Sequence, residues 1–203
     1  MVGKAVYSWW EYPSVIIVAD PGQVDADLAT GRLACPHCGG RLRPWAHATS
    51  RRVRQLDGST TLVRPRRARC TGCRATQVLL PGTLVPRRAD AAQVIGAALV
   101  AKARGRGWRR IAADLDRPPA TVRRWLRAAR GHHLAWLRHQ AVRHAALLAP
   151  EVLADLAAQP TDLGDALAAF GAAVAAWRRR YVRHAEAWTL IGAFTRGRLL
   201  TPI

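Results

Sequence analysis

The sequence predicts a mixed α+β fold, with a small β unit early in the chain and helices after it. Two patterns support this prediction. Between residues 35 and 80, short runs of strand-forming residues alternate with turn signals. From residue 87 onward, apolar residues recur instead at the spacing of a helix face. A chain of 203 residues is long enough for one core or for two or three small modules.

Shifts in composition divide the chain into four predicted segments. They are a lead-in (1–34), a β unit (35–86), a three-helix unit (87–131) and a helical C-terminal region (132–203). The lead-in contains a β-branched run at 14–18 and a candidate short helix within 24–33. We interpret Trp9, Trp10 and Tyr12 as cover for the β unit, with base stacking as the less favoured alternative.

The β unit contains a strong hairpin signal. Residues 51–56 and 60–64 are candidate strands on either side of Asp57-Gly58, a dipeptide typical of tight hairpin turns. The second strand is expected to run on to Cys70, and residues 76–80 supply a further apolar strand.

All four cysteines of the chain fall into two Cys-x-x-Cys pairs, at the two ends of this hairpin. The four are Cys35, Cys38, Cys70 and Cys73. Two pairs at this spacing predict a structural Zn²⁺ bound by four thiolates, and a hairpin between two such pairs is the plan of a zinc ribbon. Four thiolates leave no open position for substrate, so the metal is expected to hold the fold only. We favour zinc over iron because the chain is large and basic, and the cysteines over His37 and His47 as ligands.

Residues 87–131 predict three helices. Asp90 is a candidate N-cap for the first, whose apolar face includes Ile95 and Leu99, and Gly105 is expected to end it. The second and third helices are expected at 108–115 and 120–130.

The second and third of these helices fit a helix-turn-helix. Ala112 is small enough for two helices to approach, Asp116 stands at the turn, and Val122 returns to the core. A generic helical hairpin is the alternative. In a helix-turn-helix the second helix enters the major groove of DNA. The predicted DNA-facing residues are Ala120, Thr121, Arg123, Arg124 and Arg127, and the predicted phosphate contacts are Arg109, Arg110 and Arg117.

The charge of the chain is strongly positive and uneven. The formal net charge is +19, and 30 of the 32 basic residues are arginine. Residues 1–149 carry 26 basic and 8 acidic side chains, so nearly all of the excess lies there. Such an excess favours polyanions, above all nucleic acid, although a GC-rich genome also enriches arginine. Candidate phosphate contacts on the hairpin are Arg51, Arg52, Arg54, Arg66 and Arg67.

The C-terminal region predicts alanine-rich helices that break at Pro150 and at Pro160-Thr161, with Thr161 as the N-cap of a long helix. Its nearly balanced charge and apolar stripe allow two interpretations. The favoured one packs these helices against the three-helix unit, and the other reserves them for a partner or for self-association. The tail from Gly197 is expected to be extended.

At these motifs the chain resembles a family of uncharacterised bacterial proteins often encoded beside insertion-sequence transposases. The resemblance rests on the CPHCGG, RPRRARCTGC and IAADLDRPPATVRRWLR segments and covers roughly residues 33–130. It implies a zinc ribbon, a homeodomain-like helix-turn-helix and a link to mobile elements, and it implies no reaction. The family commonly has histidine where this chain has Gln77.

The sequence therefore predicts a non-catalytic protein that binds double-stranded DNA. Its few carboxylates show no pattern for holding catalytic metal ions, and no small-molecule substrate or membrane is expected. Two roles stay open: an accessory or targeting factor of a mobile element, with a separate transposase as partner, or a transcriptional regulator with a dimerising C-terminus. RNA binding through the ribbon is a third, less favoured role. We expect the protein in the cytoplasm, associated with the nucleoid.

Overall fold

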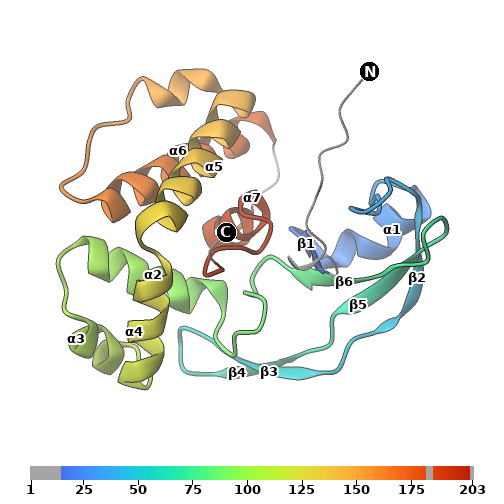
Figure 1. The fold of residues 1–203 in the computed structure, drawn as a ribbon, viewed down its shortest axis with the longest axis horizontal. Helices are drawn as coiled ribbons and strands as arrows, with labels where there is room; N and C mark the ends of the chain where they lie inside the picture. Colours follow the sequence, from blue (N-terminus) through green and yellow to red (C-terminus); the bar gives the residue numbers. More distant parts are fainter. Residues whose placement is uncertain (1–14, 182–184, 202–203) are drawn as a thin grey trace.

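The computed structural model describes residues 15–181 and 185–201 and has a mixed α+β fold, as the sequence predicts (Figure 1). The described strands are β1 (Val15–Val18), β2 (Leu42–His47), β3 (Arg51–Arg54), β4 (Thr60–Val63), β5 (Arg66–Cys70) and β6 (Thr76–Pro81). The described α-helices are α1 (Val24–Ala29), α2 (Ala92–Ala103), α3 (Trp108–Asp114), α4 (Pro119–Ala128), α5 (Gly131–Leu148), α6 (Asp162–Arg180) and α7 (Ala187–Phe194). Trp9, Trp10 and Tyr12 lie outside the described residues, so their roles stay predictions.

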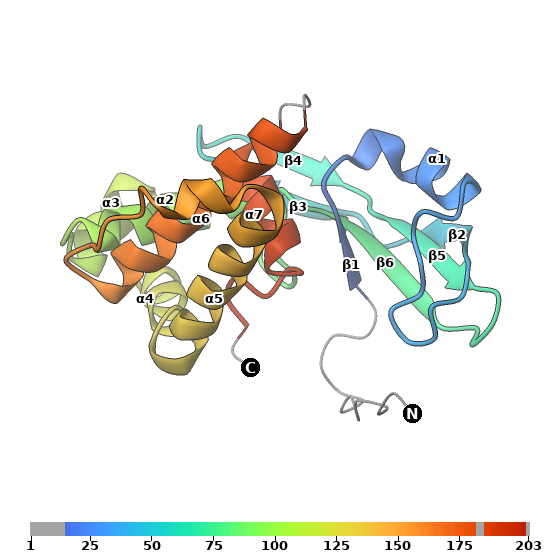
Figure 2. The same ribbon diagram turned by 90° about the horizontal axis from the view of Figure 1, so that it is seen from above.

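Four strands form one sheet in the order β1-β6-β5-β2, with α1 packed on one face (Figure 2). Val24 and Leu28 of α1 share a small core with Leu42, Ala68 and Leu79 of the sheet. Strand β1 pairs in parallel with β6, whereas the β6–β5 and β5–β2 pairs are antiparallel. The lead-in thus closes one edge of the sheet, and β2 forms the other.

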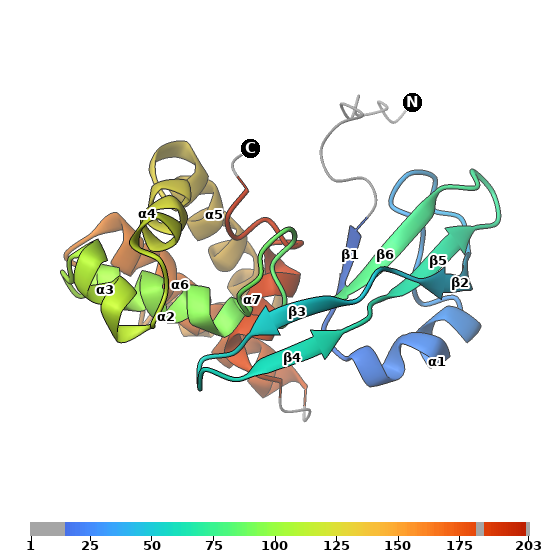
Figure 3. The ribbon, with the colours of Figure 1, turned by 90° about the horizontal axis from the view of Figure 1, so that it is seen from below.

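The predicted hairpin forms a long arm that joins this sheet to the helices (Figure 3). Strands β3 and β4 pair as a separate two-stranded sheet, and Gly58 in their turn has a φ of 83°. A backbone hydrogen bond of 2.8 Å from Ala48 to Pro65 connects the arm to the β2–β5 pair behind it. Val53 in β3 is fully buried in the helical core, so the arm is anchored at its far end.

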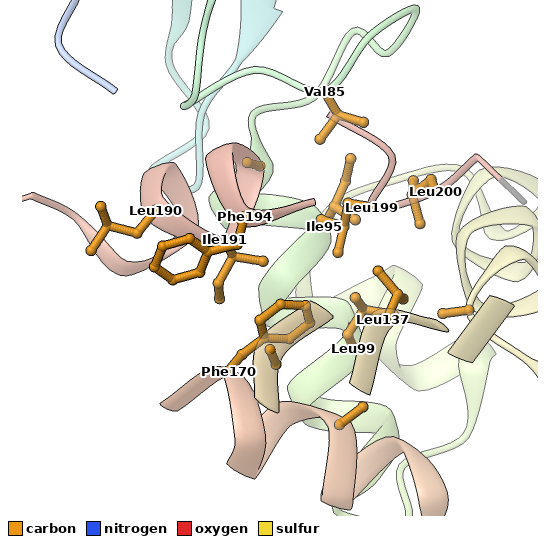
Figure 4. Close-up of a cluster of buried hydrophobic side chains, with 14 of the residues drawn as sticks. Val85, Ile95, Leu99, Leu137, Phe170, Leu190, Ile191, Phe194, Leu199 and Leu200 are labelled. Carbon is orange, nitrogen blue, oxygen red and sulfur yellow. The ribbon is translucent and has the colours of Figure 1, made fainter. Parts of the chain in front are cut away.

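Helices α2 to α7 pack around one apolar core, which includes Ile95, Leu137, Phe170 and Ile191 (Figure 4). Helices α2 to α6 lie where the sequence predicts helices, with boundaries that differ by a few residues, whereas α7 is not predicted as a separate helix. The C-terminal helices use their apolar faces in this core, in agreement with the favoured interpretation. A 3₁₀ helix at Pro150–Leu153 follows α5.

Two features of the helical part differ from the sequence predictions. Asp90 does not cap α2: the N-cap residue is Ala91, and the buried Asp90 carboxylate binds two arginines instead. The tail is not extended, because turns fold residues 195–201 back and bury Leu199 and Leu200. Thr161 does cap α6, since its hydroxyl accepts a hydrogen bond from the Gly164 N–H at 3.0 Å. Over the described ranges, none of the helices combines the length and hydropathy required to cross a bilayer.

Candidate metal centre and basic surfaces

The four cysteines converge at one end of the sheet. Cys35 and Cys38 precede β2, while Cys70 ends β5 and Cys73 lies in the turn to β6. All four Sγ atoms lie within 4.8 Å of one another. The Sγ atoms of Cys35 and Cys73 are 3.6 Å apart, and those of Cys38 and Cys70 are 3.5 Å apart.

This spacing fits a tetrahedral metal ion. Four sulfurs at about 2.3 Å from a central zinc would be separated by about 3.8 Å, close to the two observed short distances. No histidine or carboxylate joins the cluster among the described residues, so His37 and His47 are not needed as ligands. The four cysteines can therefore bind a metal ion, and the donor set is that of a structural site.

The two Cys-x-x-Cys loops have the same backbone design. In the first, the Cys35 N–H donates to the Gly40 carbonyl at 2.9 Å, and in the second the Cys70 N–H donates to the Ala75 carbonyl at 2.9 Å. The residue after the second cysteine is left-handed in both, with φ of 70° at Gly39 and 65° at Arg74. Such related loops place two sulfurs each on opposite sides of a common point.

The loops leave almost no free space around the sulfurs. A Cβ atom on Gly40 would lie 3.1 Å from Cys70 Sγ and 3.2 Å from Cys38 Sγ. Burial raises the pKa of the Cys70 thiol, but hydrogen bonds from the Cys73 backbone and the Cys38 thiol outweigh it and lower the pKa to about 6. These hydrogen bonds favour the thiolate at Cys70, the form that binds metal.

Helices α3 and α4 form the second candidate site. The turn between them contains Asp116 with a φ of 50°, the left-handed conformation expected at this position. Ala112 and Val122 are buried at 1% and 0% exposure, and Trp125 of α4 is buried at 1%. The two residues predicted to lie where these helices meet, Ala112 and Val122, are therefore buried.

The outer face of α4 carries the side chains predicted to face DNA. Arg123, Arg124, Arg127 and Ala120 are exposed, whereas Thr121 is half-buried. The opposite face holds Trp125 and the other buried residues, so α4 has one basic and one apolar side.

A basic pocket of about 220 Å³ lies beside α4, and sequence reasoning missed it. Its lining contains four cations and two apolar side chains and no carboxylate: Lys102, Trp108, Arg123, Leu126, Arg127 and Arg130. These residues come from α2, α3, α4 and the segment after α4, and no sequence pattern brings them together. Convergent cations without an acid produce a positive potential that favours anions such as phosphate.

Trp108 organises the cations near this pocket. The guanidinium carbons of Arg109 and Arg123 lie 4.8 and 5.8 Å from the centre of its ring. Arg109 and Arg110 are both exposed at the start of α3, and Arg110 also pairs with Asp114 at 3.3 Å. These two predicted phosphate contacts therefore stay on the surface next to α4.

The structure places Arg117 elsewhere than the sequence predicts. Only 8% of this residue is exposed, and its guanidinium binds the Asp90 carboxylate at 2.7 Å and the Gln55 carbonyl at 2.9 Å. It also donates to the carbonyls of Leu115 and Asp116. Arg117 is therefore buried and hydrogen-bonded on several sides. It joins the turn of the helix pair to the hairpin arm and is not part of the exposed basic surface.

The five hairpin arginines differ in their ion pairs and in their exposure. Arg54 binds Asp90 at 2.8 Å, and Arg66 binds Asp25 of α1 at 2.6 Å. Arg51 is half-buried, and burial lowers the pKa of its guanidinium. Arg52 is exposed, and Arg67 is half-buried on the sheet. Of these five arginines, the exposed Arg52 is thus the best candidate for phosphate contact.

Residues 35–125 match a protein family described as a domain of unknown function (DUF6431). The match begins at the first cysteine of the metal cluster and ends at Trp125 in α4, so it contains the four cysteines and most of the helix pair but not Arg127 or Arg130. It covers less than half of the chain, and its description names no activity and no link to transposases. Neither the curated proteins nor the solved structures contain a match to this chain.

Proposed function

We propose that the protein is a non-catalytic DNA-binding protein in which α3 and α4 act as a helix-turn-helix and α4 reads the major groove. One observation carries the proposal: Arg123, Arg124 and Arg127 share the exposed face of α4. The buried face of the same helix fixes it in the core, so these arginines stand on a rigid element. Arginine binds guanine in the major groove through two hydrogen bonds.

The surroundings of α4 support phosphate binding on its flank. The basic pocket beside α4 and the exposed Arg109 and Arg110 place positive charge next to the outer face of the helix. In DNA-binding helical units, contacts of this kind fix the register of the protein on the duplex while base contacts specify sequence. Arg130 lies in this pocket outside the helix, so we assign it to phosphate.

We assign the four cysteines to a zinc ribbon with a structural Zn²⁺. The small core beside the cysteines holds few large apolar side chains, so metal binding would supply much of its folding free energy. The ribbon would then hold the hairpin arm that reaches the turn between α3 and α4.

The proposed absence of catalysis rests on the carboxylates. Among the described residues Asp90 is the one buried carboxylate, and Arg54 and Arg117 neutralise it. A buried acid held by two arginines is a poor general base and a poor metal ligand. We further propose that the protein serves a mobile element as an accessory or targeting factor, an extension that rests on the sequence resemblance alone.

Selection of bound sequences from a random duplex pool tests DNA binding directly. The selected duplex is then titrated by fluorescence anisotropy with wild type, Arg124→Ala and Arg143→Ala. Arg143 is an exposed arginine on α5, so its variant loses the same charge away from α4. We expect Arg124→Ala to weaken binding by about 1–3 kcal/mol and to relax the preference at one base pair. Arg143→Ala should bind like wild type.

A second variant separates phosphate contact from base reading. Arg130→Ala should weaken binding to all duplexes about equally and reduce the dependence on salt, because one phosphate contact is lost. Wild-type affinity and preference in Arg124→Ala would refute the docking of α4. Failure of wild type to bind any duplex at moderate salt would refute the proposed function.

A further inference from the structure

Trp45 lies on the open edge strand of the sheet and is 58% exposed. It stands at a bulge in β2, where the pairing with β5 shifts register between Pro44 and Ala46. Of the tryptophans that the structure describes, Trp45 alone is exposed, and the others are half-buried or buried. A bulge commonly re-aims a side chain, and here the indole projects from a strand whose remaining residues contribute little to the core.

The indole shares its face of the sheet with arginines. The guanidinium carbon of Arg69 lies 4.6 Å from the centre of the Trp45 ring. Arg69 pairs directly with Arg43 across the β2–β5 ladder, so both side chains point to the same side. Arg67 lies two residues before Arg69 on β5 and faces that side as well. We call Arg43, Trp45, Arg67 and Arg69 the ribbon platform.

The opposite face of β2 and β5 packs against α1. Ala68 and Leu42 bury themselves under α1, and Arg66 pairs with Asp25 of that helix. On this side Arg43 and Trp45 are exposed and Arg67 and Arg69 are half-buried, and β2 and β5 contain no acidic residue that could pair with these arginines. The face therefore combines an exposed aromatic plane with excess positive charge.

We propose that the ribbon platform binds single-stranded nucleic acid, with an unpaired base stacked on Trp45 and the backbone phosphates on the arginines. An exposed aromatic ring within a basic surface is the arrangement that stacks bases without reading their sequence. Arg69 lies over one side of the 58% exposed indole, so we assign the base to its other side. In an intact duplex the bases are already stacked, so this site prefers unpaired strands. The inference is independent of duplex binding through α4.

The test compares a single-stranded oligothymidylate with a duplex of equal length, titrated by anisotropy with the zinc-loaded full chain. Trp45→Ala should weaken single-strand binding about 5- to 100-fold, the range that loss of one base stack produces. Duplex affinity should change less than twofold. Trp45→Phe keeps an aromatic plane and should recover most of the loss. Leu62→Ala removes an apolar side chain that is 67% exposed on β4, and it should bind both ligands like wild type.

A second readout reports stacking itself. A single strand that contains 2-aminopurine should lose fluorescence on binding wild type and Trp45→Phe, and much less on binding Trp45→Ala. A matched oligouridylate shows whether the site takes RNA or DNA. Equal single-strand binding by wild type and Trp45→Ala, at unchanged metal content and unfolding temperature, would overturn the proposal and leave this face to another ligand. The Arg124→Ala experiment tests duplex binding through α4 separately, so either that proposal or the single-strand proposal can fail without the other.

Discussion

The guanidinium Nε of Arg117 lies 2.7 Å from the carboxylate of Asp90, and both side chains are at most 5% exposed. The second oxygen of Asp90 accepts a hydrogen bond from Arg54 of β3 at 2.8 Å. Backbone hydrogen bonds from Arg54 to Ala89 and from Ala91 to Arg54 run alongside. One carboxylate thus joins the hairpin arm, the start of α2 and the turn before α4.

Removal of this carboxylate should destabilise the whole chain. In Asp90→Ala, Arg117 stays buried with an unpaired charge, and breaking a buried ion pair in this way costs about 3–5 kcal/mol. Urea unfolding followed by circular dichroism measures the change. Asp114 provides the control, because it pairs with Arg106 and Arg110 at a more exposed position. Asp114→Ala should cost less than about 1 kcal/mol. Equal effects in the two variants would contradict the assigned role of Asp90.

Metal content is the second prediction. Purified protein should contain one zinc per chain, and replacement by cobalt should give the absorption of a tetrahedral thiolate site. Removal by a chelator should unfold the β unit, since a structural zinc contributes about 10–16 kcal/mol to folding in small metal domains. Elemental analysis and circular dichroism measure both effects.

Two variants locate the metal. Cys70→Ser should lose it, whereas His37→Asn should keep it, because His37 is not part of the sulfur cluster. Iron in place of zinc would correct the metal assignment, and metal-free protein of full stability would refute the site.

Gly96 of α2 gives the third prediction. A Cβ atom there would lie 2.0 Å from the indole of Trp188, so the helix and the ring cannot both keep their positions. Gly96→Ala should cost about 1–3 kcal/mol by overpacking. Gly171 of α6 is the matched control, because a Cβ atom added to it would meet nothing within 4 Å. Gly171→Ala should instead stabilise by about 0.5–1 kcal/mol, as in any exposed helix. Thermal unfolding measures both, and shifts of the same sign would contradict this packing.

Local patterns predict most of the elements. The Asp57-Gly58 turn, the two cysteine loops and the spacing of apolar residues in α3 and α4 each act over a few residues, and the structure has the corresponding elements. Strand β2 escapes prediction because five of its six residues are exposed and show no alternation. The cap at Thr161 is predictable because its hydrogen bond is local.

Long-range partners explain what the sequence does not predict. Asp90 at the start of a helix has the pattern of a cap, but its two arginines stand 36 and 27 residues away and bind it more strongly than backbone N–H groups would. The parallel pairing of β1 with β6 joins the lead-in to the last strand of the β unit, about 60 residues further along the chain. The basic pocket likewise needs Lys102, Trp108 and Arg130 at one point, which only the packed helices provide.

His133 of α5 makes stability depend on pH. It is 4% exposed, its Nε2 lies 3.3 Å from the Leu199 carbonyl, and its Nδ1 has no hydrogen-bond partner within the described part of the chain. Burial lowers the pKa of His133 below its usual value near 6.5, although backbone hydrogen bonds to Leu199 and Arg198 oppose the shift. The folded state therefore takes up a proton less readily than the unfolded chain. The stability that the neutral His133 contributes is fully present above about pH 6.5 and is lost as the pH falls through the folded pKa.

The contribution of His133 can be isolated by comparing the pH dependence of stability in wild type and in one variant. His133→Gln can still donate to the Leu199 carbonyl but does not titrate, so it should lose less stability than wild type between pH 7.5 and 5.5. Thiolate protonation and metal loss also weaken the fold in acid, but they affect both proteins alike and cancel in the comparison. His139→Gln changes an exposed histidine of the same helix and should keep the wild-type dependence. Urea midpoints at the two pH values measure the loss of stability. Equal losses in all three proteins would show that protonation of His133 is not linked to folding.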